Sequence, residues 1–485
     1  MFSDIQNLYS FFPPINYPYL YTRKTTSYSR LIMAGIYLHI PFCKRRCIYC
    51  DFFSTTENDK KSTYVQALSK ELELRKDYLD GEIIGTIYFG GGTPSQLEEK
   101  DFIQLFETIY RIYTVNPEAE ITLEANPDDL TPEYIAMLRT LPFNRLSMGI
   151  QTFKEDTLRL LHRRHTAAQA QQAYQHCREA GFQNISIDLM YGLPGETLED
   201  WQKDLQTALQ MHPEHISAYH LIYEEGTPLW NLKEAHQVEE TDEDLSVSLF
   251  KELIHTLKSN GYEHYEISNF CRPGFHSRHN SSYWTGKKYL GCGPSAHSYD
   301  GTSRQWNVAS LSQYIQGIQK GTPYQEKEEL DLYTRYNDFI ITRLRTVYGI
   351  PTHILKKTFG ETLFDYCMRM ASPHLKQGFL TLSNHILTVS SDFFLLFLIQ
   401  LVRINWFSVF YNYMCFFDTR HMSLQHICGV RDRHRDNRTA ALFRNLETSL
   451  FEWEHQIVRF ISCAFREDTH GNSILYIVDS GKDRF

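Results

Sequence analysis

Three cysteines close together are the residues of this chain best suited to metal chemistry. Cys43, Cys47 and Cys50 fall in the run His39-Ile-Pro-Phe-Cys43-Lys-Arg-Arg-Cys47-Ile-Tyr-Cys50. Three thiolates converging at this spacing can ligate three irons of a 4Fe–4S cluster, which leaves the fourth iron open to a small chelating molecule. Zinc suits the set poorly, since no fourth ligand is evident. Three unligated core cysteines are the plain alternative, which the polar, reactive setting of the loop disfavours.

A glycine-rich turn is the second candidate binding element. Gly90-Gly91-Gly92-Thr93-Pro94-Ser95 directly follows the apolar run Thr86–Phe89. Glycine lets a backbone approach a ligand closely and accept positive φ. Such a turn alone is usually only a turn. Its place after the second strand candidate, one strand beyond the cysteines, makes it a binding candidate.

Four polar residues accompany later strand candidates. Glu124 and Gln151 lie at the ends of two strands, Asp188 lies in Ile-Asp-Leu-Met-Tyr, and we expect Arg163 in the helix after the fourth strand. Taken alone, each is typical of a satisfied residue at a barrel rim. Together they offer carboxylate and amide hydrogen bonds and an arginine that could pair with a ligand carboxylate.

The elements that must position these residues alternate between apolar runs and amphipathic helical stretches. The strand candidates are Ile36–Ile40, Thr86–Phe89, Ile121–Ala125, Arg145–Ile150, Ile185–Met190 and His215–Ile222. The helix candidates are Tyr64–Tyr78, Glu98–Tyr113, Pro132–Leu141, Glu155–Leu161, Ala167–Ala180 and Leu198–Met211. Six strand–helix units in series predict a parallel α/β sheet, in the form of a partial, TIM-like (β/α)6 barrel. Ligands of such sheets bind beyond the carboxyl ends of the strands.

The cysteine spacing after the strand Tyr37-Leu-His-Ile-Pro-Phe resembles the radical S-adenosylmethionine superfamily, over roughly residues 35 to 392. The resemblance implies a partial (β/α)6 barrel and a 4Fe–4S cluster on Cys43, Cys47 and Cys50. It implies that the open iron chelates S-adenosylmethionine, which one electron cleaves to methionine and a 5′-deoxyadenosyl radical. The residues it assigns to S-adenosylmethionine are Tyr37, Tyr49, Gly91, Gly92, Thr93, Glu124, Gln151, Arg163 and Asp188.

Two branches of that superfamily are similar to this chain. Oxygen-independent coproporphyrinogen III oxidases, enzymes of porphyrin biosynthesis, also have Thr at the place of Thr93. They carry a further cysteine two residues after the third, where this chain has Phe52, and an N-terminal capping region that residues 1–33 do not match. The HemW-type heme chaperones are the closer resemblance. Their mark is a His-Asn-x-x-Tyr-Trp segment, present here as His279-Asn280-Ser-Ser-Tyr283-Trp284.

The resemblance to heme chaperones implies that heme is a further cofactor, held by His279, Asn280, Tyr283 and Trp284. Histidine is a common axial ligand of heme iron, and aromatic rings can pack on a porphyrin face. Other candidate ligands lie nearby in the sequence: Cys271, Cys292 and His297.

The resemblance therefore predicts a protein that binds heme and transfers it to respiratory acceptor proteins. The alternative is radical decarboxylation of coproporphyrinogen III, or radical chemistry on another substrate. Whether the chain is an enzyme stays open, and the missing fourth cysteine argues against oxidase activity.

Composition limits the class of protein further. The chain has 485 residues, 42% of them hydrophobic, which is enough for roughly two to three domains. A net charge of −9 gives no sign of a nucleic-acid partner. Ten irregularly spaced cysteines do not resemble a secreted disulfide scaffold. We expect a cytoplasmic protein, with at most a peripheral membrane association, and leave a homodimer open.

Five segments are predicted along the chain. The N-terminal one has no secretion signal, and Met33 is a hypothetical alternative start. Within the rest we expect a helix over 241–262, a loop-rich stretch Cys271–Gly301, a helix over 330–347 and a hairpin of Gly378–Thr381 with His385–Val389 around the turn Ser383-Asn384. The predicted segments are a disordered extension (1–33), the barrel (34–240), a barrel-completing helix and heme-motif region (241–324), a small helix-plus-hairpin, winged-helix-like module (325–392) and an atypical tail (393–485).

The tail breaks the agreement between local and global signals. Phe393–Phe417 is mostly apolar, but Arg403, Asn405 and Asn412 would each be costly inside a bilayer. We therefore favour a shifted reading frame over a transmembrane helix for this region.

Overall fold

The computed structural model describes residues 33–322 and 324–390, so the predictions for 1–32 and for the tail lie outside the described residues. Six parallel strands pair in chain order, as the sequence predicts. They are β1 (Ala34–Ile40), β2 (Ile84–Gly91), β3 (Val115–Ala125), β4 (Arg145–Gln151), β5 (Ile185–Tyr191) and β6 (His215–His220).

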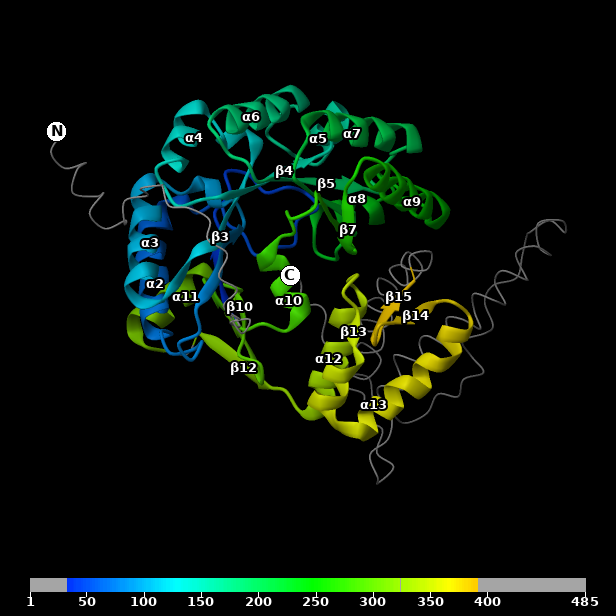
Figure 1. Cartoon of the computed structure of the whole chain (residues 1–485). Coiled ribbons are helices and arrows are strands. Elements are labelled where there is room, and N and C mark those ends of the chain that lie inside the picture. The colour runs from blue at the N-terminus through cyan, green and yellow to red at the C-terminus, as the bar shows by residue number, and fades with distance from the viewer. Residues whose placement is uncertain (1–32, 323, 391–485) are drawn as a thin grey trace, which may run out of the picture. The chain divides into compact units, whose positions relative to one another are not determined.

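Helices line the outer side of these strands (Figure 1). Each presents an apolar stripe at helical spacing, as α3 does with Leu105, Phe106 and Ile109, all buried. Most of those stripes pack in one large hydrophobic core with alternate residues of the strands, such as Leu38 and Phe89, whereas Leu229 lies in a smaller cluster with Leu193 and Leu221. The helices are α2 (Lys61–Leu74), α3 (Glu99–Ile112), α4 (Pro132–Leu138), α5 (Glu155–Leu160), α6 (Ala167–Glu179), α7 (Leu198–Met211), α8 (Pro228–Glu234), α9 (Glu243–Ser259) and α11 (Leu311–Lys320).

The opposite face of the same strands is polar. Successive strand residues point to opposite faces, so each apolar residue of the core alternates with a residue of the inner face. On that face Tyr88 bonds Glu124 of the next strand, and Ser147 lies 3.2 Å from an Asp188 oxygen. The strand alternation thus creates an interior lined with hydroxyls and carboxylates, which is suited to a polar ligand.

The parallel strands continue into antiparallel ones at both ends of the sheet. Beyond β1 lie β9 (Tyr289–Cys292), β10 (His297–Tyr299), β11 (Ser303–Asn307) and β12 (Gln325–Glu329), and beyond β6 lie β8 (Asn269–Cys271) and β7 (Glu263–Glu266). Within the described residues β12 and β7 end the order and do not pair with each other, so the barrel is open. The stretch Cys271–Gly301, expected to be loop-rich, holds β9, β10 and a helix, α10 (Arg278–Thr285).

Residues beyond 330 form a second hydrophobic core of their own. Its elements are α12 (Leu332–Leu344), β13 (Ile350–Pro351), α13 (Thr352–Lys376), β14 (Leu380–Ser383) and β15 (Ile386–Val389). The predicted hairpin is present, but its turn is Asn384-His385, where both residues have positive φ. The sequence reading missed α13, because Gly360 and Pro373 interrupt the helical pattern.

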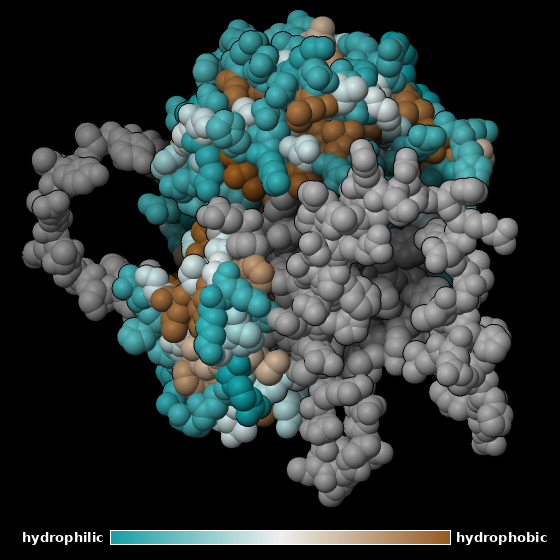
Figure 2. Space-filling view, turned by 90° about the vertical axis from the view of Figure 1, so that its right-hand side faces the viewer, coloured by the Kyte–Doolittle hydropathy of each residue, from teal (hydrophilic) through white to brown (hydrophobic). Residues whose placement is uncertain are grey.

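On the face seen in Figure 2, the coloured surface is mainly hydrophilic, with separate hydrophobic patches. None of the helices in the described ranges is long and apolar enough to cross a membrane. The run Phe393–Phe417 lies outside those ranges.

Candidate functional site

The three cysteines lie in one loop that leaves the carboxyl end of β1. Backbone hydrogen bonds of Cys43 N to Thr55 O (2.8 Å) and of Thr55 N to Pro41 O (2.7 Å) close the base of this loop. Cys43 is buried and Cys47 and Cys50 are half-buried, all as free thiols. Three soft sulfur donors are thus held in one loop, which is the donor set that an iron–sulfur cluster needs.

Burial keeps the Cys43 and Cys50 thiols protonated when no metal is bound. It raises the pKa of Cys50 to about 12, with smaller contributions from the neighbouring Cys47 and Cys43, and it also raises the pKa of Cys43. Metal ligation requires thiolates, so loading a cluster here must release protons.

The glycine-rich turn packs directly against the cysteine loop. Gly91 has φ of +110°, and a Cβ there would lie 2.7 Å from the His39 ring. A Cβ on Gly92 would lie 2.7 Å from the Pro41 backbone. The next residue, Thr93, places its hydroxyl 3.3 Å from Cys43 Sγ. Glycine is required at both positions because any side chain would push the turn away from the cysteines.

Asp129 fastens the loop and the turn together. Its carboxylate accepts hydrogen bonds from Lys44 of the cysteine loop (2.8 Å) and from Ser95 (2.8 Å) and Gln96 (2.6 Å) of the turn. Burial opposes its ionisation, but these bonds and Arg164 hold the pKa of Asp129 below its ordinary value. Sequence reasoning missed Asp129, although its place after the third strand was a signal that could have found it.

Arg163 lies between α5 and α6, so the prediction that it belongs to a helix is wrong. The loop lets its guanidinium reach back to the strand ends. Nη1 lies 3.3 Å from Cys47 Sγ, and Nη2 donates to Asn126 Oδ1 (2.8 Å) and to the Gly149 carbonyl. Nε is buried and has no partner among the described residues. An arginine beside a cluster ligand with a free donor fits a ligand carboxylate.

Tyr49 lies beside the same arginine. Burial raises the pKa of its phenol, against the opposing effect of Arg163. Tyr37 stands on the inner face of β1, where its hydroxyl is 3.1 Å from His39 Nδ1. Both predicted aromatic residues therefore border the cysteine loop or the strand that leads into it.

Glu124 joins the glycine-rich turn to the polar interior. Its carboxylate accepts hydrogen bonds from the Tyr88 hydroxyl (2.7 Å) and from Gly91 N (3.1 Å). Burial raises its pKa to about 7, and the negative charge of Asp188 adds to that rise. A carboxyl with a pKa near neutrality can both accept and release a proton under physiological conditions.

Asp188 and Gln151 are placed differently from each other. Asp188 is in the middle of β5 and not at its end, paired with Gly149 on one side and Ser217 on the other. Burial raises its pKa to about 6, against the opposing charge of Arg145. Gln151 ends β4 with φ of +73°, a strained conformation for a non-glycine residue, which is typical of functional sites. Its side-chain amide lies near Gly149 and Arg163.

Arg145 is a buried charge that sequence reasoning missed. The residue is only 1% exposed, and its Nε and Nη1 have no hydrogen-bond partner among the described residues. Its charge acts on Glu124, Asp188 and His279. The sequence did contain a signal for it: a basic residue begins a mostly apolar strand. A charge buried there is costly unless it is paired, so its partner needs to be identified.

The predicted heme residues lie on α10, away from the cysteines. His279 is 1% exposed, and both ring nitrogens are engaged, Nδ1 with Thr86 Oγ1 (2.8 Å) and Nε2 with the Tyr283 hydroxyl (2.8 Å). Burial lowers its pKa to about 3. Trp284 instead packs under the guanidinium of Arg345, 3.8 Å from the ring centre. Asn280 lies in the first turn of α10, its backbone bonded to the Ser277 cap.

The two predicted sites centre on different levels of the strands, and Tyr88 connects them. His279 bonds Thr86, near the start of β2, whereas the glycine-rich turn follows the end of β2 at Gly91. Five residues of strand separate Thr86 from Gly91, or roughly 16 Å. The structure therefore gathers the cysteine loop, the turn, Glu124 and Arg163. His279 lies deeper on the same inner face, where it stacks on Tyr88 (4.9 Å between ring centres), whose hydroxyl bonds Glu124.

Comparisons with known proteins show the family of this chain. The sequence profile described as Radical SAM superfamily matches residues 37–208. The chain is 34% identical over 334 residues to Heme chaperone HemW of Bacillus subtilis (strain 168), covering 68% of this chain and 88% of that one. It is 36% identical over 327 residues to Heme chaperone HemW of Lactococcus lactis subsp. lactis (strain IL1403), covering 67% of this chain and 84% of that one.

A solved structure shows the same fold. Coproporphyrinogen III oxidase (HemN) from Escherichia coli, a radical SAM enzyme, superposes with a TM-score of 0.67 at 24% identity, covering 75% of this chain and 88% of that one. The donor set of the cysteine loop, the glycine cradle and the unpartnered Arg163 Nε fit the cluster and the S-adenosylmethionine that this superfamily implies. This chain belongs to the radical SAM superfamily and, within it, to the HemW family.

Proposed function

We propose that this protein is a heme chaperone, which binds heme and transfers it to acceptor proteins. The observation that carries the proposal is the likeness to proteins named heme chaperone over most of their length. A second observation supports it against the alternative of coproporphyrinogen III oxidation. The position of the further cysteine of that branch is occupied by Phe52, whose side chain is exposed and offers no metal ligand.

In this proposal Cys43, Cys47 and Cys50 hold a 4Fe–4S cluster, which supplies single electrons and an open iron for S-adenosylmethionine. Arg163 binds the carboxylate of that molecule with its free Nε. The remaining contacts fall to the inner-face residues and the turn: Tyr37, Tyr49, Gly91, Gly92, Thr93, Glu124, Gln151 and Asp188.

The His279 motif has a structural role in this conformation. Its two hydrogen bonds and its stacking on Tyr88, 4.9 Å between ring centres, satisfy the imidazole. Axial ligation of heme iron by His279 therefore requires that the bond to Tyr283 breaks, if Nε2 is the ligand atom, or the bond to Thr86, if Nδ1 is. Of the other candidate ligands, Cys271 and Cys292 are buried, whereas His297 has a half-exposed ring, stacked 6.1 Å from Trp306.

We further propose that the protein works in the cytoplasm, with respiratory heme proteins as acceptors. A homodimer is compatible with the proposal but is not required by it. Productive cleavage of S-adenosylmethionine is likewise not required for heme transfer.

The test uses anaerobically reconstituted full-length protein. One arm titrates it with heme, and a second incubates it with coproporphyrinogen III, S-adenosylmethionine and a reductant. Stoichiometric heme binding without decarboxylation is expected, followed by transfer to an apo-cytochrome. Formation of protoporphyrinogen would replace the proposal with the oxidase alternative, and the absence of both activities would refute the chaperone.

Three histidine variants locate the heme ligand. His279→Ala and His297→Ala are compared with His255→Ala, which changes an exposed residue of α9. Loss of the heme Soret band in only one of the first two variants identifies the ligand.

A further inference from the structure

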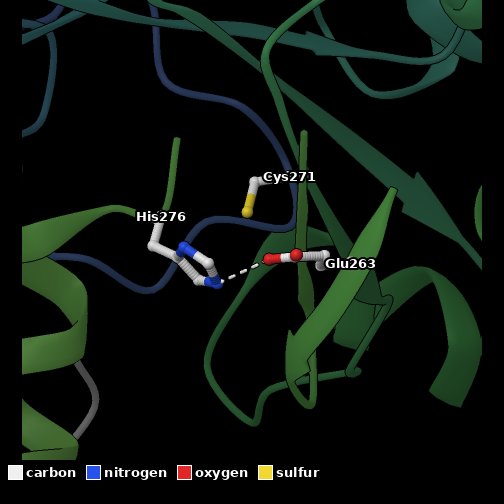
Figure 3. A group of neighbouring side chains, drawn as sticks. All are labelled: Glu263, Cys271 and His276. Atoms are coloured by element: carbon white, nitrogen blue, oxygen red, sulfur yellow. Dashed lines mark ion pairs between the residues drawn. The ribbon is translucent and has the colours of Figure 1, made fainter. Parts of the chain in front are cut away.

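A second set of metal-binding side chains lies outside the cysteine loop. Glu263, Cys271 and His276 each bring one ligand atom to within 4.8 Å of the other two. Figure 3 shows their side chains converging on one point, from two strands and the loop that follows. Glu263 Oε2 and His276 Nε2 are 3.2 Å apart. Among the described residues, no other three side chains of the His, Cys, Asp or Glu type bring their ligand atoms this close together.

The fold holds two of these residues in fixed positions. Glu263 on β7 and Cys271 on β8 are directly paired across the antiparallel ladder. Directly opposite residues of such a pair have Cβ atoms about 4.5–5.5 Å apart on the same face. On its other side Cys271 pairs with His215 of β6, so the cysteine lies within the sheet and is buried. Two ligands are therefore preset by strand register.

A tight turn brings the third residue back to the other two. Phe275 N donates to Arg272 O (3.0 Å), and Gly274 between them has φ of +89°. With Pro273 before that glycine, the sequence and the positive φ fit a type II turn. The turn reverses the chain immediately after β8 and returns His276 toward Cys271. Two paired strands and a hydrogen-bonded turn thus position all three side chains.

We propose that Glu263, Cys271 and His276 bind a zinc ion. Thiolate sulfur, imidazole nitrogen and carboxylate oxygen are the three donor types that zinc uses. On binding, the Cys271 thiol loses its proton to solvent, and the thiolate and carboxylate together balance the 2+ charge of the ion. Bond lengths of about 2.0–2.3 Å place tetrahedral ligand atoms roughly 3.3–3.8 Å apart, which small side-chain rotations achieve here. The fourth position is left to water or another ligand.

The position of this site suggests what the ion does. His276 directly precedes Ser277, whose side chain caps α10 by accepting a hydrogen bond from Asn280 N. The His276 ring also packs edge-on against Tyr265, 4.6 Å between ring centres. A zinc ion would therefore tie the start of α10, with its His279 motif, to the β7–β8 hairpin.

The experiment measures zinc in the full-length protein with its cluster reconstituted. Protein is incubated with zinc sulfate, desalted and analysed for metal by mass spectrometry. One zinc per chain is expected in addition to the cluster iron. Cobalt replacing zinc should give the intense visible bands and the sulfur-to-metal charge-transfer band of tetrahedral thiolate coordination. Cys271→Ser and His276→Ala are expected to lower zinc affinity more than about 100-fold.

Matched variants keep the test informative. Cys177→Ser changes another buried cysteine, on α6, and should retain the zinc. Glu263→Gln changes a half-exposed side chain with little loss of volume, and should weaken binding while leaving the far-UV circular dichroism unchanged. Zinc should raise the melting temperature of the wild type but not of Cys271→Ser. No bound zinc in the wild type, or equal zinc in all variants, would overturn the proposal.

Discussion

His279 Nε2 and the Tyr283 hydroxyl lie 2.8 Å apart, one helical turn apart along α10. The other ring nitrogen bonds Thr86. A histidine in this state has no free nitrogen for iron, so two residues of the heme-chaperone motif first serve to fix α10 against the strands. Heme binding through Nε2 of His279 then becomes a competition with Tyr283, which can be tested directly, and binding through Nδ1 a competition with Thr86.

Tyr283→Phe releases the competing hydrogen bond. If His279 is the axial ligand, this variant should bind heme about 3- to 10-fold more tightly, because one net hydrogen bond of about 1 kcal/mol no longer opposes ligation. Heme titration followed by the Soret band measures the effect. Unchanged affinity in Tyr283→Phe, with heme lost in His297→Ala, would place the ligand on β10 instead.

Replacement of His279 by alanine tests its structural role without heme. The variant leaves Thr86 and Tyr283 without their imidazole partner and opens a cavity, so we expect a loss of about 2–4 kcal/mol in the free energy of unfolding. Urea unfolding of the apo protein measures it. His255→Ala, on the exposed side of α9, should change the value by less than about 0.5 kcal/mol. An equally small effect in both variants would contradict a structural role.

Asp129→Asn should loosen the cysteine loop. The substitution removes the charge that Lys44, Ser95 and Gln96 bond, and charged hydrogen bonds contribute about 1.5–3 kcal/mol. We expect lower iron content after reconstitution and faster loss of the cluster absorbance in air. Asp156→Asn, an exposed control on α5, should behave as the wild type. Normal cluster content in Asp129→Asn would show that the loop is held by other contacts.

Arg163→Lys tests the proposed contact with S-adenosylmethionine. Lysine keeps the positive charge but loses the planar fork and the free Nε, so affinity should fall about 10- to 100-fold. Isothermal titration of the reconstituted protein with S-adenosylmethionine measures it. Arg159→Lys on the exposed side of α5 is the control. A drop in iron content without a change in affinity would mean that Arg163 acts through Cys47.

The raised pKa of Glu124 predicts how the free energy of unfolding depends on pH. Its pKa is about 7 in the folded protein and near 4.5 when unfolded, so between these values the folded state keeps a proton that the unfolded state releases. Stability from this group is therefore present at pH 4.5 and below, and is lost as pH rises to 7. Wild type should lose about 2–3 kcal/mol more than Glu124→Gln between pH 5 and pH 8.

Urea unfolding of the apo protein at the two pH values provides the comparison. Glu107→Gln, an exposed residue of α3, serves as the matched control and should follow the wild type. Identical pH dependence in wild type and Glu124→Gln would show that Glu124 is ionised throughout.

The sequence by itself determined the six strand–helix units and the cysteine loop that follows the first strand. Those features are local, because a helix or strand shows its period within a dozen residues, and the ligand spacing of the loop is a property of one short segment. The six parallel strands and their chain order therefore agree with the prediction, with ends shifted by a few residues in most elements.

Only the tertiary structure decided which side chains meet. Asp129 joins two loops, Arg163 reaches Cys47, and Glu263 faces Cys271, each through contacts between separate elements. Such contacts depend on strand register and on loop paths, and a shift of one residue in register turns every side chain to the other face. The burial of His279 is a consequence of the same kind, since its surroundings come from β2, where Thr86 lies 193 residues earlier in the chain, and from β1, which lies earlier still.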